Sequence, residues 1–417
     1  MGQTVLKTLK LVVVILFFRI TPCFGYSVLT HEALIDANWD KVLVPLLKQK
    51  FPSATAEELK KAHAFAYGGA VAPDMGYYPL GSKLFTNLVH YVRSGDFIEN
   101  LFEEVKDINE YAFALGVLCH YYADVYGHSI GVNKSVPLIY PKIKTKFGNT
   151  VTYADDKLSH LRVEFSFDVL QTARGNYATE AYHDFIGFQV SKELLERAFR
   201  KTYGLEIKDL FSDFDRAVGT FRWSVKSLFP TVTKAAWKTR SDEIRKTNSS
   251  ASRRNYIYRI RRHEYYSEFG RERDKHSFGA WLLSLFIRIA PKIGPLKVFK
   301  FKTPTPEAEK IFLKSFDETV LNYDNGITKI RNGKIELANM DWDTGKEARQ
   351  YEYRLADRTY SDWVIKLKEK KFETVTSSMK ENILAFYKNY SADPAVDASQ
   401  WQQTTAALEE LKSTKLQ

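Results

Sequence analysis

Apolar residues recur at three- and four-residue spacing along much of the chain, which is the pattern of helices that bury one face. Clusters of turn-forming residues interrupt this pattern, and the sequence contains no series of alternating strands and no repeat of solenoid length. The sequence therefore predicts a mainly α fold. The clearest predicted helices cover residues 56–67, 109–126, 155–171 and 191–202. The predicted loops cover residues 73–82, 135–149 and 248–252.

The composition of the chain changes near Trp237. Residues 237–275 hold twelve Lys or Arg against six Asp or Glu, interleaved with tyrosines, and an apolar stretch over residues 278–290 follows. One interpretation is a basic, aromatic surface over residues 237–290 that docks on an anionic membrane. The other is a solvated helix face followed by one buried helix. Both interpretations place a boundary between a first region, residues 26–236, and a basic second region.

Helical signals continue to the C-terminus. Thr305 is a suitable capping residue, Pro306 suits the first helical position, and residues 309–321 supply an apolar stripe. The last hundred residues predict further helices and contain no motif with recognisable chemistry. We therefore expect residues 237–417 to be mainly helical.

Residues 1–25 have the features of a secretory signal peptide. A start with two lysines precedes an apolar run that is too short to span a bilayer, and Cys23 and Gly25 supply small residues before a cut. A lipoprotein cysteine at Cys23 is the less favoured alternative, because Pro22 stands where a small residue is expected. We therefore expect an exported protein, either periplasmic or secreted.

Composition and charge narrow the class of protein. With 44% hydrophobic and 27% charged residues, the chain has the composition of a globular protein and not of a disordered one. Its net charge is +11, and the signal peptide contributes only three of those positive charges. Such a surface favours anionic partners, whether nucleic acid, phospholipid or phosphorylated sugar. Cys119 is the only cysteine after residue 25, so we expect no intrachain disulfide.

Three residues with metal-binding side chains share one predicted helix. His120, Asp124 and His128 are spaced four apart, so they form one stripe of an α-helix. This helix begins with the almost entirely apolar residues 111–119 and must be buried, yet an unpaired carboxylate inside a protein costs several kcal/mol. A bound cation would remove that cost.

A second helix repeats this arrangement. His160 and Glu164 place an imidazole and a carboxylate side by side, and zinc takes nitrogen and oxygen ligands of these types. A single buried histidine is more often a hydrogen-bonded core residue, and one His–Asp pair at this spacing can lie on the surface. Two such helices, together with Asp74 in a predicted loop and His90 on the next apolar segment, favour a metal site.

In order along the chain, these residues resemble the motifs of the zinc-dependent phospholipase C/D family. Its members include bacterial phospholipases C and fungal single-strand nucleases. The block from His120 to His128, with Ser129-Ile130-Gly131 behind it, is most similar to the catalytic domain of glycosylphosphatidylinositol-specific phospholipase D. The resemblance covers about residues 26–200, and no propeller repeats or β-sandwich follow it. The quoted motifs are Tyr26-Ser-Val-Leu-Thr-His31, Pro73-Asp74, His90-Tyr91, His120-Tyr-Tyr-Ala-Asp124-Val-Tyr-Gly-His128 and His160-Leu-Arg-Val-Glu164.

The resemblance implies three zinc ions in a multi-helix, phospholipase C/nuclease-like domain followed by further helices. It assigns one zinc to Asp74, His90, His120 and one oxygen of Asp124. It assigns a second zinc to His128, His160 and Glu164. The third would be bound by the new α-amine and carbonyl of Tyr26, by His31 and by Asp124. The family usually begins with Trp at this position, so Tyr26 leaves the cleavage site open.

The implied activity is phosphodiester hydrolysis by a water that bridges two zinc ions and attacks phosphorus. Asp74 and Asp124 would be the catalytic carboxylates, with Asp74 placed to orient or deprotonate the water. The expected substrate is a membrane phospholipid, cleaved by C-type or D-type hydrolysis. One alternative is a single-strand nuclease or 3′-nucleotidase with bases stacked on Tyr77 or Tyr153. Nuclease relatives have a longer gap after this aspartate, so the three residues between Asp124 and His128 favour a lipid substrate. A protein that holds zinc only for structure is the other alternative.

Overall fold

The computed structural model describes residues 28–174, 176–177, 186–225, 297, 300–333, 335–388 and 396–414. Among these residues helices make up nearly all of the regular structure, so the predicted mainly α fold is confirmed. The signal peptide of residues 1–25, Tyr26, the basic segment 237–290 and the predicted loop 248–252 lie outside the described residues.

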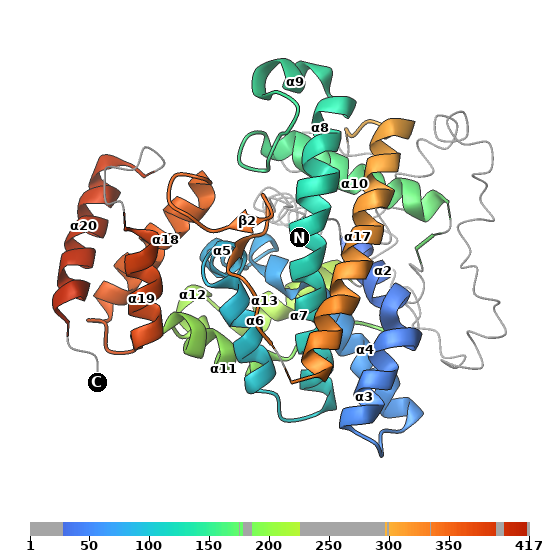
Figure 1. Cartoon of the computed structure of the whole chain (residues 1–417), viewed down its shortest axis with the longest axis horizontal. Coiled ribbons are helices and arrows are strands. Elements are labelled where there is room, and N and C mark those ends of the chain that lie inside the picture. Colours follow the sequence, from blue (N-terminus) through green and yellow to red (C-terminus); the bar gives the residue numbers. More distant parts are fainter. Residues whose placement is uncertain are drawn as a thin grey trace, which may run out of the picture.

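The first region contains a long central helix, α7, that the other helices surround (Figure 1). Its first elements are α2 (Val28–Asn38), the π-helix η1 (Trp39–Leu43), α3 (Val44–Lys50), α4 (Ala56–Val71), the 3₁₀-helix η2 (Ala72–Tyr77), α5 (Lys83–Tyr91) and α6 (Ser94–Glu103). The chain continues through α7 (Ile108–Tyr126), the π-helix η3 (Gly127–Val132), α8 (Asn133–Ile139), α9 (Pro141–Phe147) and α10 (Lys157–Ala173). It ends with α11 (Lys192–Tyr203), α12 (Ile207–Leu210) and α13 (Phe214–Trp223).

The second region adds one long helix beside α7 and a separate group of three helices, at the left of Figure 1. Thr305 caps the long helix by accepting a hydrogen bond from the backbone N–H of Ala308, and Pro306 is its first residue, as the sequence predicts. The elements are α17 (Pro306–Arg331), β1 (Met340–Asp341), β2 (Lys346–Glu347), α18 (Arg354–Glu369), α19 (Ser377–Phe386) and α20 (Ala398–Ser413). The antiparallel pair β1–β2 forms the only sheet among the described residues.

The four clearest predicted helices are present as α4, α7, α10 and α11, with ends that differ by a few residues. The start of α10 follows its capping signal, because the Asp156 side chain accepts a hydrogen bond from the backbone N–H of Ser159.

The predicted loop over residues 135–149 is wrong, because most of it forms α8 and α9. Pro137 lies within α8, where it cannot donate to the carbonyl of Asn133, and the backbone N–H of Val151 donates to that carbonyl instead (2.9 Å). Pro141 occupies the first turn of α9, where the missing N–H costs nothing. One proline inside α8 and one at the start of α9 are therefore compatible with helix, although such residues usually indicate a loop.

The predicted loop over residues 73–82 is also partly wrong, since η2 covers its first half. The Thr86 hydroxyl of α5 donates to the carbonyl of Pro73 and accepts from the backbone N–H of Gly76. A Cβ on Gly76 would lie 2.0 Å from the carbonyl oxygen of Ser82, so only glycine fits there. These contacts fix η2 against α5.

Glycines allow α4 and α7 to pack closely. A Cβ on Gly116 of α7 would lie 2.1 Å from the carbonyl oxygen of Ala66, and one on Gly69 of α4 would lie 2.0 Å from that of Phe113. This close approach fixes α7, which carries His120 and Asp124, against α4, whose Ala70 carbonyl accepts a hydrogen bond from His120.

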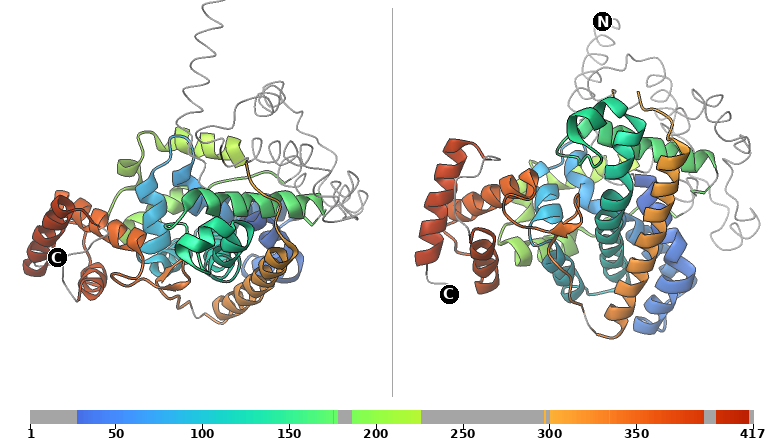
Figure 2. Two further views of the ribbon diagram at one scale, coloured as in Figure 1. Left: turned by 90° about the horizontal axis from the view of Figure 1, so that it is seen from above. Right: turned by 45° about the horizontal axis from the view of Figure 1, so that its top comes forward.

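One hydrophobic core includes residues from both regions. Figure 2 shows α17 of the second region lying along the helices of the first. The Tyr323 hydroxyl of α17 donates to the carbonyl of Leu115 on α7, and the Trp363 indole of α18 donates to the carbonyl of Tyr203 on α11 (2.8 Å each). Among the described residues no helix combines the length and apolar character needed to cross a bilayer.

Candidate metal centre

Helix α7 places His120 and Asp124 side by side on one face, as their spacing predicts. Both side chains are fully buried, and Nε2 of His120 lies 3.1 Å from Oδ2 of Asp124. His128 lies one turn further along, in the π-helix η3, with Nε2 at 3.4 Å from Oδ1 of Asp124. π-Helical turns occur often at functional sites, and this one places His128 on the same side as Asp124.

Two further histidines reach Asp124 from other helices. His31 of α2 places Nε2 at 3.5 Å from Oδ1 of Asp124, and its ring stacks on that of His120 with centroids 4.2 Å apart. His90 at the end of α5 places Nε2 at 3.3 Å from Oδ2. The carboxylate therefore faces four imidazoles, two at each oxygen.

Asp74 of η2 extends this cluster. Its Oδ1 lies 3.4 Å from Nε2 of His90, and the side chain is 2% exposed. Thr86 connects the two residues: its hydroxyl holds η2 at Pro73, and its carbonyl accepts a hydrogen bond from Nδ1 of His90 (2.8 Å). Nδ1 of His120 likewise donates to the carbonyl of Ala70 (2.7 Å). Both rings thus turn Nε2 toward the cluster, as metal-binding histidines do.

A second group lies on the other side of Asp124. Nδ1 of His160 is 2.7 Å from Oε1 of Glu164, and Nδ1 of His128 is 3.8 Å from the same oxygen. Nε2 of His160 is 2.9 Å from Oδ1 of Asn133. Since an amide oxygen only accepts, this contact places the ring proton on Nε2 and leaves Nδ1 for a ligand.

These donors fall into three groups whose ligand atoms lie within 4.8 Å of one another. Two of the groups share His120, and His128 of the third group lies beside Asp124. Every member is buried. They comprise His31, His120 and Asp124; Asp74, His90 and His120; and His128, His160 and Glu164.

The donor set fits bound zinc. Two ligand atoms that share a tetrahedral zinc, each at about 2.1 Å from it, lie about 3.4 Å apart, which matches the spacings between Asp124, Asp74 and the imidazoles. Neither oxygen of Asp124, nor Oδ1 of Asp74, accepts a hydrogen bond, although all three atoms are buried. Buried carboxylate oxygens without donors cost free energy, and bound zinc would remove that cost.

The pKa values of the cluster favour the metal-binding forms of two histidines and of Asp124. Burial, reinforced by neighbouring imidazoles, lowers the pKa values of His31 and His160 well below the ordinary histidine value, so both rings are neutral. Burial opposes ionisation of Asp124, but His120 and His128 hold its pKa well below its usual range. For His90 burial is outweighed by the Asp124 and Asp74 carboxylates, which raise its pKa to about 10. Metal binding at His90 therefore releases a proton.

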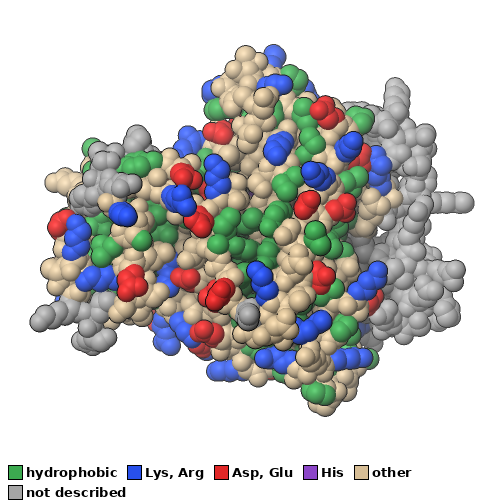
Figure 3. All heavy atoms as spheres, in the orientation of Figure 1, with side chains coloured by type: hydrophobic (Ala, Val, Ile, Leu, Met, Phe, Trp, Pro, Cys, Tyr) green, Lys and Arg blue, Asp and Glu red, His purple; other side chains and the backbone are tan. Residues whose placement is uncertain are grey.

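Eight of the nine predicted ligands therefore lie together, and the ninth, Tyr26, is outside the described residues. The space-filling view of one face shows no histidine at the surface (Figure 3). Sequence reasoning missed Thr86 and Asn133, which hold the rings of His90 and His160, because neither residue type signals such a role. It also missed Trp342, whose ring centroid lies 4.7 Å from that of His90.

Comparison with known proteins agrees with this geometry. Residues 30–213 match the family model described as zinc-dependent phospholipase C. This region belongs to that family. The matched segment contains all eight of the assembled donors, and the description of the family names zinc and a phospholipase C activity. No curated protein and no solved structure matches the chain.

Proposed function

We propose that this zinc-dependent phospholipase C family member is a phosphodiesterase that hydrolyses membrane phospholipids at a centre of three zinc ions. The observation that supports it is the Asp124 carboxylate, which faces four imidazoles and joins adjacent donor groups. Adjacent metal ions suit in-line displacement at phosphorus, because they stabilise both the attacking and the leaving oxygen.

The ligands divide as the family resemblance implies. Asp74, His90 and His120 would hold one ion together with Asp124. The third ion, at His31 and Asp124, would be completed by the α-amine of Tyr26 after removal of residues 1–25. The second ion would be held by His128, His160 and Glu164.

Bound zinc would acidify a water molecule and neutralise charge on the phosphoryl oxygens. Asp74 would then orient that water or accept its proton, because it is a buried carboxylate within the donor set. Asp124 would hold the donor groups at a fixed spacing. Thr86 and Asn133 would keep the rings of His90 and His160 in their ligating orientation.

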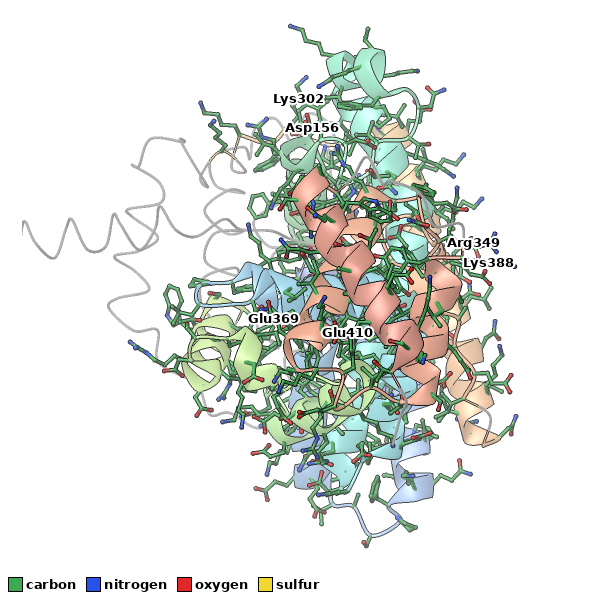
Figure 4. All side chains as sticks on the ribbon, turned by 90° about the vertical axis from the view of Figure 1, so that its left-hand side faces the viewer. Asp156, Lys302, Arg349, Glu369, Lys388 and Glu410 are labelled. Atoms are coloured by element: carbon green, nitrogen blue, oxygen red, sulfur yellow. The ribbon has the colours of Figure 1, made fainter. Side chains whose placement is uncertain are left out.

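An anionic lipid surface is the partner that the charge distribution favours. The exposed residues of α9 include Lys142, Lys144 and Lys146. Lys302 lies at the same end of the molecule (Figure 4), with its Nζ 5.2 Å from the ring centroid of Tyr140, just before α9. Lysines beside aromatic rings suit a phospholipid headgroup layer. We propose that this face acts together with the basic segment 237–290, in an exported, secreted or periplasmic protein.

A nuclease or 3′-nucleotidase is the second candidate, and a pair of tyrosines favours it. The rings of Tyr77 and Tyr153 lie 6.3 Å apart, and they lie near His90 and His160 respectively. Half-buried aromatic rings beside a metal centre can stack on bases.

The deciding experiment supplies purified, processed protein with phosphatidylcholine vesicles, phosphatidylinositol vesicles and single-stranded DNA, with and without a chelator. Diacylglycerol released only in the absence of chelator supports the proposal. Phosphatidic acid would indicate D-type cleavage, and nucleotide release would indicate the nuclease. Glu164→Gln should abolish turnover, whereas Glu309→Gln, a buried glutamate outside the cluster, should retain it. No chelator-sensitive turnover of any substrate would contradict the proposal and leave a structural zinc protein.

A further inference from the structure

A turn in the second region lies directly against the candidate metal centre. Residues 341–344 are the last residue of β1 and the first three residues of the turn to β2, more than 170 residues after the last predicted ligand. The backbone N–H of Trp342 donates to the carbonyl of His90 at the end of α5 (3.3 Å). The Trp342 ring is fully buried, with its centroid 4.7 Å from that of His90 and 5.4 Å from that of His120. One side chain therefore supports two imidazoles from different helices.

The same turn reaches the second donor group through Asn133. The side-chain amide of Asn133 donates to the carbonyl of Asp343 (2.7 Å) while its oxygen accepts from Nε2 of His160. The Asp343 carbonyl thus decides which way the Asn133 amide faces. If the amide were reversed, it would present N–H groups to Nε2 of His160 and would favour a proton on Nδ1, the atom that faces Glu164.

The turn is itself held rigidly. The Asp341 carboxylate accepts hydrogen bonds from the backbone N–H of Asp343 (3.0 Å) and from the hydroxyl of Thr344 (2.7 Å). The Asp343 carboxylate accepts from the hydroxyls of Tyr91 (2.8 Å) and Tyr353. Two tyrosines from different regions therefore fix the residue that contacts Asn133.

We propose that residues 341–344 form a positioning element of the metal centre, which orients His90 and His120 through Trp342 and His160 through Asp343 and Asn133. The second region would then be part of the catalytic centre, although it lies outside the segment that matches the family. This inference rests on the proposed zinc site and not on the substrate. Outer contacts of this kind change metal affinity by about 10–100-fold.

The alternative is that residues 341–344 are an ordinary part of the core, which contributes to stability but does not affect zinc binding. Trp363 provides a matched control, because it is a fully buried tryptophan of the same region whose indole donates to Tyr203 and contacts no predicted ligand. The Trp342 indole N–H has no hydrogen-bond partner among the described residues, so Trp342→Phe removes no hydrogen bond.

The test compares Trp342→Phe, Asp343→Ala, Asp343→Asn and Trp363→Phe by zinc affinity in a metal buffer, by the visible spectrum of the Co²⁺-substituted protein and by urea unfolding. We expect Trp342→Phe and Asp343→Ala to weaken zinc binding about 10-fold or more and to shift the Co²⁺ bands. Asp343→Asn keeps an oxygen that can accept from Tyr91 and Tyr353, so its zinc affinity should stay close to that of the wild type. Trp363→Phe should lower stability alone.

Unchanged affinity and spectra in both Trp342→Phe and Asp343→Ala would overturn the proposal. If Asp343→Ala does not fold, Trp342→Phe decides the matter, because it removes only ring volume. The readouts use no lipid, so an enzyme that binds zinc normally but cleaves no phospholipid would contradict the proposed function and leave this inference standing.

Discussion

Asp124→Asn is the substitution that tests the centre most directly. The change keeps the size of a fully buried side chain but removes the charge that faces the imidazoles of His31, His90, His120 and His128. Under the proposed assignment two of the three zinc ions depend on this carboxylate. We therefore expect the purified variant to retain one zinc, at His128, His160 and Glu164, and to lose activity.

The stability loss follows from mass action. An ion that binds only the folded state stabilises it by about 2.7 kcal/mol when its free concentration is 100 times Kd. Loss of two ions should then lower the free energy of unfolding by about 5 kcal/mol at that zinc concentration, a large part of the stability of a typical protein. Addition of a chelator should destabilise the wild type strongly and the variant much less.

The measurements are zinc content by elemental analysis and urea unfolding with buffered zinc or chelator. Asp357→Asn is the matched control, because Asp357 is a buried aspartate of α18 that accepts a backbone hydrogen bond from Tyr351 outside the cluster. It should keep full zinc content. If Asp124→Asn also keeps the wild-type zinc content and the wild-type response to chelator, Asp124 is not a shared ligand and the assignment is wrong.

Two further predictions concern packing and pH. Gly116→Ala should destabilise the protein by about 2 kcal/mol or more in urea unfolding, because its Cβ would overlap the Ala66 carbonyl. The control Gly219→Ala adds a Cβ in open space, so it should be neutral or stabilising. Equal effects of the two substitutions would contradict the packing argument. Burial and the Asp343 carboxylate raise the pKa of Asp341 to about 8, so the unfolded chain releases this proton first and the free energy of unfolding should fall as pH rises from about 4 to 8. Asp341→Asn should flatten that fall between pH 5 and 8, and an unchanged slope would refute it.

Local signals in the sequence predicted the mainly α fold and the positions of α4, α7, α10, α11 and α17. Thr305 and Pro306 mark the start of α17, and Asp156 marks that of α10, because caps act within one turn of the chain. Pro137 misled the prediction because its effect depends on a distant donor, the Val151 N–H, which takes the carbonyl that proline leaves free. The π-helical turn at His128 has no sequence signal either.

The sequence predicted the ligands that share a helix, but it did not predict the residues that position them from distant parts of the chain. His120, Asp124 and His128 follow helical periodicity, so their proximity is a property of one segment. Trp342 and Asp343 form an ordinary dipeptide more than 200 residues further along, and only the packing of the second region brings them to His90 and Asn133. Such contacts depend on tertiary structure, which periodicity does not encode.

The distribution of the donors also links zinc binding to folding. The eight donors come from α2, η2, α5, α7, η3 and α10, so no short segment can form the centre before these elements meet. Bringing Asp74, Asp124 and Glu164 together in the interior costs several kcal/mol unless positive charge accompanies them. Zinc therefore stabilises the assembled helices and not any one of them. Because Trp342 and Asp343 contact the same assembly, this stabilisation extends from the first region into the second.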